Sequence, residues 1–395
     1  CNKKSNQKNL GTIKSSNLCV APETKILTSQ GQMIISELKD EEVEVWNGEE
    51  FSKVTVKQTG INQKLLTVHT SKGLSLRCTP YHKFWIVGHR EPIEAQHLTK
   101  DMKIIKHSLP VINSNNKIKK YAYTHGLFCA DGTTSSSDNE KRCRYKAKEN
   151  GLCMRHRTNM KEYDNDGTCQ ANSHSEQKWL DLYHDKKKLL QYIEYDYACT
   201  NDGCNRMRLR LPKDIDEKFN VPMDYSLKTK LEWLAGVLDG DGCALKHQGG
   251  RGVSIHLGSI HYNFLNDILL LLQTLGVNSR LNVGREETIQ DMPGGRYKCQ
   301  KLWRLLIPSG GVECLKNLGL STKRLDIKTD TLPNRQALHF EKIVSVEDLS
   351  ETADTYCFNE PKRHRGIFNG ILTGNCSEIV EYSNAEETAV CNLSS

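Results

Sequence analysis

One junction in the sequence has residues that could break and remake the peptide chain. Asn375 stands directly before Cys376 in this 395-residue chain. An Asn side-chain amide can attack its own main-chain carbonyl and close a succinimide, while a Cys thiol beside it can carry an acyl group as a thioester. Alone, Asn-Cys is also an ordinary loop dipeptide. However, SSNL before Cys19 and SEIVEY after Cys376 join into one continuous segment, which indicates that residues 19–375 are an insert that removes itself.

The composition favours a soluble chain of two or three domains. It is 37% hydrophobic and 26% charged, with a mean hydropathy of −0.59. No run approaches the ~18 apolar residues of a membrane helix. The start, CNKKSNQKNL, lacks the apolar core of a secretion signal, and it lacks an initiator Met, which indicates a fragment. We therefore expect a cytoplasmic, non-secreted protein with no membrane partner.

Cysteine usage and charge narrow the function classes further. The chain has 15 Cys and no secretion signal, which favours reduced thiols, metal ligands or catalytic cysteines over a disulfide framework. The net charge of +7, spread along the chain, is compatible with nucleic-acid binding but does not require it.

The segments on either side of the insert resemble part of a known enzyme family. SNQKNLGTIKSSNL before it, with CSEIVEYS and AVCNLSS after it, is similar to the active-site segment of the class I ribonucleotide reductase large subunit. The resemblance implies a thiyl radical on Cys376, with Asn17 and Glu378 binding the ribose and assisting proton transfer. It also implies that Cys391 is one half of a redox dithiol. These roles belong to the joined product, after the insert has left.

Residues 19–108 have the pattern of an all-β domain. Short runs such as EVEVW, SKVTVKQTG and KFWIV alternate or are β-rich, and Gly or Asn separates them. The opening CVAPETKIL and the later TPYH resemble the N-terminal blocks of inteins, which have the Hint fold. The resemblance implies that Cys19 attacks the Leu18 carbonyl, with help from Thr79 and His82. Without the junctions, TPYH would read as a strand and turn with a satisfied histidine.

Residues 331–375 return to β character, in LHFEKIVSVEDLS, DTYCFNE and PKRHRGIFNGILTGN. This part resembles the C-terminal intein blocks, which implies that His364 assists the cyclisation of Asn375. Two positions depart from the pattern. Gly374 stands where most inteins have His, which leaves the assisting role to His364. Cys357 stands where Asp is common, and could be a helper thiol or a buried Cys without a role.

Between the two β segments, residues 109–330 contain two related motifs. YTHGLFCADG carries Asp131, and LAGVLDGDG carries Asp241. Small residues in both would let two helices approach closely, so the carboxylates would meet at the end of the pair and could hold Mg²⁺ against phosphodiester oxygens. The second motif has six of the nine letters of LAGLIDADG, so the region resembles a single-chain LAGLIDADG homing endonuclease. The alternative is an ordinary helix that ends in Asp-Gly.

Strand and helix patterns follow each motif, as two α/β half-repeats require. Their sheets could form a saddle over double-stranded DNA, with Arg208, Arg210 and Arg304 as phosphate or base contacts. Lys213 matches a position that, in the family resembled, often holds a lysine near the scissile phosphate. Each of these residues could equally be a solvated surface charge.

An extra stretch in the first half, about residues 135–172, has the ligands for a zinc site. The spacing is C-x9-C-x2-H-x12-C, and the stretch has too few apolar residues for a core. A disordered insert with unpaired thiols is the alternative. The four candidate ligands are Cys143, Cys153, His156 and Cys169, and the competing ones are His174, Cys199 and Cys204.

The sequence thus predicts a mixed α/β fold, in which an all-β Hint (intein) splicing domain contains an inserted α+β LAGLIDADG endonuclease domain. The expected parts are the reductase segments 1–18 and 376–395, the splicing segments 19–108 and 331–375, and the endonuclease 109–330. We expect Mg²⁺ for the endonuclease and no cofactor for splicing. The expected partners are DNA of the intein-free reductase gene, and the rest of the large subunit and the small subunit after splicing. The alternative is a splicing-impaired Hint autoprocessing domain with an inactive, DNA-binding LAGLIDADG module.

Overall fold

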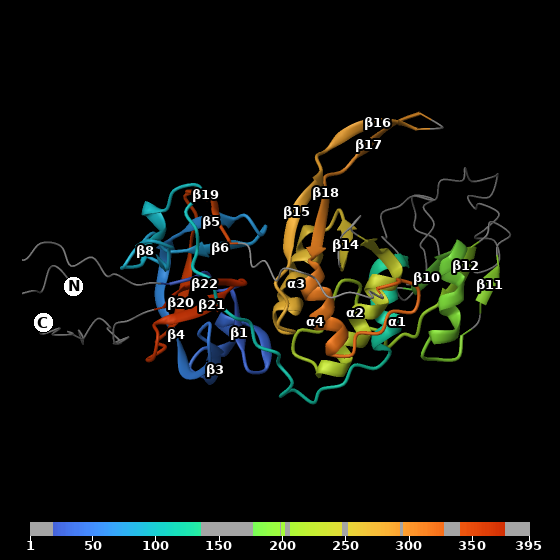
Figure 1. Ribbon diagram of the computed structural model, residues 1–395, viewed down its shortest axis with the longest axis horizontal. Helices are drawn as coiled ribbons and strands as arrows, with labels where there is room; N and C mark the ends of the chain where they lie inside the picture. Colours follow the sequence, from blue (N-terminus) through green and yellow to red (C-terminus); the bar gives the residue numbers. More distant parts are fainter. Residues whose placement is uncertain are drawn as a thin grey trace, which may run out of the picture.

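The chain forms two bodies, one built of strands and one that mixes helices and strands (Figure 1). The structure is a computed structural model and describes residues 19–135, 177–197, 199–201, 206–246, 252–292, 295–327 and 340–375. Residues 25–97 and 343–374 carry the strands of the β body, and residues 122–317 form the helices and strands of the α+β body. This nested order confirms the predicted fold class.

A seven-stranded antiparallel sheet is the frame of the β body. Its order is β20-β4-β3-β1-β21-β22, with β2 paired to β1. The strands are β1 (Lys25–Thr28), β2 (Gly31–Ile34), β3 (Glu42–Trp46), β4 (Phe51–Lys64), β20 (Thr352–Phe358), β21 (Arg365–Phe368) and β22 (Ile371–Gly374). The N-terminal strands β4, β3 and β1 lie together in this order, with C-terminal strands on both sides of them, so neither segment completes the sheet alone.

Smaller sheets close the β body. β19 pairs with β5, β5 with β6, and β7 with β8. These elements are β5 (Leu66–Thr70), β6 (Ser75–Cys78), β7 (Lys83–Phe84), β8 (Ile93–Glu94) and β19 (Ile343–Glu347), with 3-10 turns η1 (Ile35–Leu38) and η2 (Ala95–His97). Alternate residues of β5 are buried, as the period of two in a strand requires. Val68, Leu76 and Phe84 are fully buried in the core.

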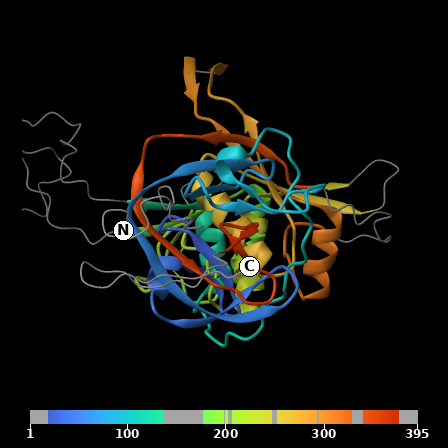
Figure 2. The same cartoon turned by 90° about the vertical axis from the view of Figure 1, so that its left-hand side faces the viewer.

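The α+β body consists of two halves, each a helix followed by a four-stranded sheet. The first half has α1 (Ala122–Asp131), β9 (Gly132–Ser135), β10 (Gln177–Tyr183), η3 (His184–Tyr192), β11 (Cys199–Asn201) and β12 (Arg206–Arg210). The second half has α2 (Leu227–Asp241), β13 (Gly242–Lys246), β14 (Val253–Ser259), α3 (Tyr262–Gln273), β15 (Arg280–Arg285), β18 (Leu302–Ile307) and α4 (Ser309–Asn317). The hairpin of β16 (Thr288–Met292) and β17 (Gly295–Cys299) projects from this body (Figures 1 and 2).

One predicted helix takes the 3-10 form. The segment KKKLLQYI has the pattern of a helix, and in the structure it lies largely within the 3-10 helix η3. Leu189 is its one fully buried residue. Since most α-helical stability in proteins comes from packing an apolar face, this lysine-rich segment has little to stabilise a regular α-helix.

The two motif helices, α1 and α2, touch through glycine. A Cβ on Gly126 would lie 2.1 Å from the carbonyl oxygen of Trp233, and a Cβ on Gly236 would lie 2.1 Å from that of Tyr123. Such distances are far below van der Waals contact, so only glycine permits this approach. The predicted close packing of the two motifs is therefore present.

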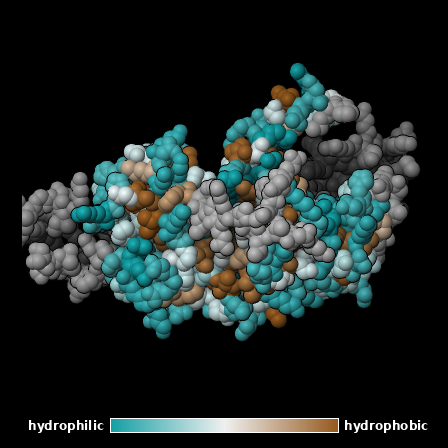
Figure 3. Space-filling model, viewed as in Figure 1, coloured by the Kyte–Doolittle hydropathy of each residue, from teal (hydrophilic) through white to brown (hydrophobic). Residues whose placement is uncertain are grey.

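Helix α3 joins the two bodies. Its Asp267 pairs with Lys25 of β1 at 2.6 Å, and the Gln273 side-chain amide donates to the carbonyl oxygen of Gly370 at 2.9 Å. The surface in Figure 3 is mostly hydrophilic, with hydrophobic residues in small separate groups. No helix in the described part of the chain is long and apolar enough to cross a membrane.

Candidate functional site

Cys19 lies fully buried on a short extended segment between two strands. Bridges join its neighbour Val20 to Tyr356 of β20 on one side and to Cys78 of β6 on the other. The main-chain N–H of Thr79 donates to the Cys19 carbonyl oxygen (2.9 Å), and the Cys19 N–H donates to the Thr79 hydroxyl oxygen (3.3 Å). The Thr79 hydroxyl therefore contacts the amide nitrogen of the peptide bond expected to break.

Two further side chains lie at the Cys19 sulfur. The Thr59 hydroxyl donates to Cys19 Sγ (2.7 Å), and Cys357 forms a buried cluster with Cys19, each with no exposed surface. Thr59 was not predicted. It lies within the long strand β4, whose alternating pattern marks a strand but no site.

His82 contacts the strand that leads to the end of the insert. Its Nε2 lies 2.8 Å from the hydroxyl oxygen of Thr373, two residues before Asn375. The ring is fully buried, edge-on to Phe84 and Phe368 with centroids 5.5 and 5.7 Å away. The sequence predicted that His82 acts at Cys19. The structure places this ring against the C-terminal hairpin, in contact with Thr373.

Asn375 is 1% exposed and held by the loop before β21. Its main-chain N–H donates to the His364 carbonyl oxygen (3.1 Å). With the amide oriented by its hydrogen bonds, the side-chain nitrogen donates to the same carbonyl (3.0 Å), and the side-chain oxygen accepts from the Glu360 N–H. His364 therefore contacts Asn375 through its main-chain carbonyl. The His364 backbone is in the left-handed conformation (φ 54°), and the residue is exposed.

Glu360 is the anchor of this loop and was missed by the sequence analysis. Its fully buried carboxylate accepts from the Lys362 and Arg363 N–H groups (3.1 and 2.7 Å) and from the Asn47 side chain (3.2 Å). Burial raises the pKa of this carboxyl, but hydrogen bonds from Ser52, Arg363 and Asn47 outweigh it and leave the pKa lowered. No motif marks Glu360, because its partners come from the β3–β4 turn, from β4 and from its own loop.

Gly374, at the position where most inteins have His, faces Lys83. A Cβ here would lie 3.1 Å from the Lys83 carbonyl oxygen and 3.2 Å from its Cβ. Both distances are tighter than ordinary contact, so a side chain would need β7 to move. The local packing therefore explains the glycine.

The two motif carboxylates meet at the end of the α1–α2 pair. Lys186 of η3 pairs with both oxygens of Asp131 (2.7 and 2.8 Å) and lies 3.8 Å from Asp241. Lys218 donates to the Gly132 carbonyl oxygen at 2.6 Å. Burial and the neighbouring charge of Asp131 raise the pKa of Asp241, the expected result of two carboxylates at one place.

This carboxylate pair fits a divalent cation. Mg²⁺ prefers hard oxygen ligands and is commonly held by one or two carboxylates together with substrate phosphates. In the described ranges there is no cluster of three or more His, Cys, Asp or Glu side chains suited to a metal, so the protein would supply two carboxylates and DNA the other oxygens. Lys186, which the sequence analysis missed, supplies the positive charge between these carboxylates here.

The predicted DNA-contacting residues have different surroundings. Arg208 is bound to the buried Asp181, with hydrogen bonds of 2.9 and 3.1 Å, and lies over the Trp179 ring. Arg210 and Arg304 are exposed on β12 and β18. Lys213 is exposed as well, and the lysines in contact with the acidic pair or its neighbouring main chain are Lys186 and Lys218.

Several predicted residues lie outside the described part of the chain. They are Asn17, Cys143, Cys153, His156, Cys169, His174, Cys204, Cys376, Glu378 and Cys391. Of the competing zinc ligands, Cys199 is placed only by its main chain, opposite Leu209 in the β11–β12 pair. The zinc prediction and the reductase residues therefore stay predictions.

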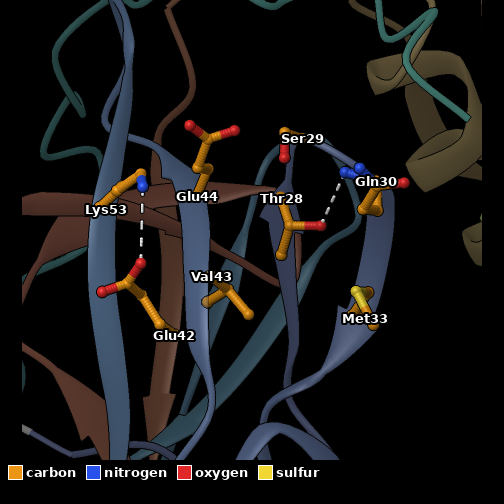
Figure 4. Close-up of a pocket in the computed structure, with 8 residues that line it drawn as sticks. All are labelled: Thr28, Ser29, Gln30, Met33, Glu42, Val43, Glu44 and Lys53. Atoms are coloured by element: carbon orange, nitrogen blue, oxygen red, sulfur yellow. Dashed lines mark hydrogen bonds and ion pairs between the residues drawn. The ribbon is translucent and has the colours of Figure 1, made fainter.

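A groove of about 320 Å³ lies on the β body (Figure 4). Its only ion pair, among the side chains drawn, joins Lys53 to Glu42 (3.5 Å), both well exposed. It is lined by Thr28, Ser29, Gln30, Met33, Glu42, Val43, Glu44 and Lys53. None of these is a predicted site residue, and we assign the groove no function.

Comparison with known families agrees with this architecture. Residues 228–310 match the family model of a LAGLIDADG-like domain. This segment begins in α2 and ends in α4, so it covers the second half of the α+β body. A β body interrupted by a LAGLIDADG-like domain is the arrangement that the sequence predicted for an intein with an inserted homing endonuclease domain.

Almost the whole chain is similar to ribonucleotide reductase large subunits. It is 41% identical, over 97% of its length, to the ribonucleoside-diphosphate reductase large subunit of Invertebrate iridescent virus 6. It is 24% identical, over the same share, to the NrdEB subunit alpha of Bacillus subtilis (strain 168). The chain spans 38% of the length of each relative. The predicted relation to this family is confirmed.

Solved inteins show weak similarity to the chain. The DnaB intein from Synechocystis sp. PCC 6803 is 20% identical with a TM-score of 0.21, covering 23% of this chain and 68% of that one. The PabCDC21-1 intein is 16% identical with a TM-score of 0.20, covering 24% and 73%.

Proposed function

We propose that residues 19–375 excise themselves by protein splicing. The Cys19 thiol attacks the Leu18 carbonyl, and the acyl group moves from nitrogen to sulfur. The Thr79 hydroxyl, in contact with the Cys19 amide nitrogen, orients that nitrogen as it leaves. His82 can supply or accept the proton near neutral pH. Cys376 then takes the acyl group by transthioesterification.

The second half of the reaction releases the insert. The Asn375 side-chain nitrogen attacks its own main-chain carbonyl, and the bond to Cys376 breaks. The His364 carbonyl, which accepts from that nitrogen, draws its hydrogen away and favours attack. A final shift from sulfur to nitrogen leaves Leu18 bonded to Cys376. Thioesters conserve the bond energy throughout, so no cofactor is required.

The contact between His82 and Thr373 is the observation that carries this proposal. It ties the loop before β7, which carries Thr79 and His82, to β22, the strand that precedes the last junction. The test is intact mass after incubation of the chain under reducing conditions at neutral pH. We expect free residues 19–375 and a ligated peptide of residues 1–18 and 376–395. Asn375→Ala should abolish C-terminal release, and full ligation in that variant would refute the mechanism.

We propose further that the α+β body is a Mg²⁺-dependent endonuclease for double-stranded DNA. Asp131 and Asp241 would hold the cation, which would polarise the phosphodiester and stabilise the leaving oxygen. Lys186 and Lys218 place positive charge beside them. The natural target would be the reductase gene without the insert. Cleavage of that DNA should need metal and be lost in Asp241→Asn; binding without cleavage by the unmodified chain would favour the inactive DNA-binding alternative.

The host proposal follows from the relatives. The spliced product would be part of a cytoplasmic ribonucleotide reductase large subunit that works with a small subunit and has no membrane partner. Cys376 would be both the splicing nucleophile and the radical cysteine, so reductase activity would begin only after excision. Full-length precursor carrying Cys19→Ala should then show no reductase activity, whereas the spliced form should.

A further inference from the structure

Cys357 lies directly opposite Cys19 across a strand pair. Val20 and Tyr356 exchange both main-chain hydrogen bonds, each of 3.0 Å. In an antiparallel ladder the neighbours of such a pair form the close, non-hydrogen-bonded pair, with Cα atoms about 4.5 Å apart. Here those neighbours are Cys19 and Cys357, which point to the same face and share a buried cluster.

This placement suits a disulfide. Bridged cysteines have Cα atoms roughly 4.4–6.8 Å apart, and the separation of about 4.5 Å expected for such a strand pair falls within that range. Both thiols are reduced in the structure. Cys78 does not compete, because its bridge is to Val20, and successive side chains of a strand point to opposite faces.

We propose that Cys19 and Cys357 form a reversible disulfide that withholds the splicing nucleophile. Hydrogen peroxide oxidises one thiol to a sulfenic acid and releases one water; the second sulfur displaces the hydroxyl, which leaves as a second water. Two thiols and one peroxide thus give one disulfide and two waters. A thiol reductant restores both cysteines.

The inference rests on the proposed splicing function. The acyl shift needs a free Cys19 sulfur to attack the Leu18 carbonyl, and a sulfur bonded to Cys357 cannot do so. Oxidation would therefore stop the reaction at its first step, before any bond of the main chain is broken. The precursor would be stored intact and would resume splicing after reduction.

The test uses the full chain with Asn375→Ala and Cys376→Ala, which retains Cys19 and accumulates as precursor. Hydrogen peroxide is the probe, because both sulfurs are buried and a small oxidant is needed. Hydroxylamine reports the first thioester by cleavage at Leu18–Cys19 without reducing disulfides. After peroxide, we expect cleavage to fall by about ten-fold or more and to recover after reduction. Peptide mapping should find Cys19 linked to Cys357.

Two further variants make the result specific. Cys78→Ala should keep the cross-linked peptide and the reversible loss of cleavage. With Cys357→Ala, the cross-link must vanish and Cys19 should instead gain oxygen. A cross-link from Cys19 to any other cysteine, or unchanged cleavage after peroxide, would overturn the inference. Absence of hydroxylamine cleavage before oxidation would instead refute the proposed splicing.

Discussion

At the residue scale, the packing around Gly374 leaves little room for the side chain that inteins usually have at this position. We predict that Gly374→Ala destabilises the β body by about 1–3 kcal/mol, because its Cβ would crowd Lys83 at 3.1 and 3.2 Å. Denaturant unfolding in a Cys19→Ala background, where splicing cannot intervene, measures this. Gly310→Ala is the matched control, since a Cβ there meets nothing within 4 Å. Equal stability of both variants would contradict the steric explanation.

Asp241 should make stability depend on pH. Its raised pKa means that the folded state binds this proton more tightly than the unfolded state does. Ionisation therefore costs stability: the cost is absent below the ordinary pKa of 3.8 and complete above the folded pKa. We predict that Asp241→Asn raises the free energy of unfolding by roughly 0.5 kcal/mol at pH 7, because the carboxylate is partly exposed. Without metal, the difference in free energy of unfolding between Asp241→Asn and the unmodified chain should shrink toward pH 4. A difference that grows on acidification would contradict the prediction.

At the element scale, α1 and α2 depend on glycine where they cross. We predict that Gly236→Ala costs about 3 kcal/mol or more, since its Cβ would lie 2.1 Å from a main-chain oxygen that cannot turn away. Thermal unfolding should show the loss in the α+β body. Gly258→Ala in β14 is the control, because the nearest atom would be 3.8 Å away. A small loss of stability in Gly236→Ala would mean that α1 and α2 can move apart at little cost in free energy.

Elements and motifs could be predicted from the sequence where a local pattern determines them. The strands of the β body follow from alternation, and the Asp131–Asp241 pair follows from two copies of one motif. Thr59, Glu360 and Lys186 could not be found, because their roles depend on partners that lie far away in the sequence. The pattern of KKKLLQYI predicted a helix but not its 3-10 form, because that form depends on how little apolar surface the fold offers the segment.

At the scale of the whole molecule, the α+β body supports the hairpin that carries Asn375. Gln273 of α3 is 1% exposed, and its side chain donates to the Gly370 carbonyl oxygen in the turn between β21 and β22. The main-chain N–H of Lys25 donates to the side-chain oxygen of Asn369 in the same turn (2.8 Å), and the Lys25 side chain pairs with Asp267 of α3. The two bodies therefore meet at the turn opposite the cleavage site.

This contact predicts that a residue of the α+β body affects splicing. Gln273→Ala would leave the buried Gly370 carbonyl without its donor, at a cost of about 1–3 kcal/mol. Because the turn fixes β22, release at Asn375 should slow more than thioester formation at Cys19. Hydroxylamine cleavage and C-terminal release, followed by intact mass, separate the two steps. Asn263→Ala, on the exposed face of the same helix, should change neither. If Gln273→Ala slows both steps equally, the helix stabilises the β body as a whole and does not position the hairpin.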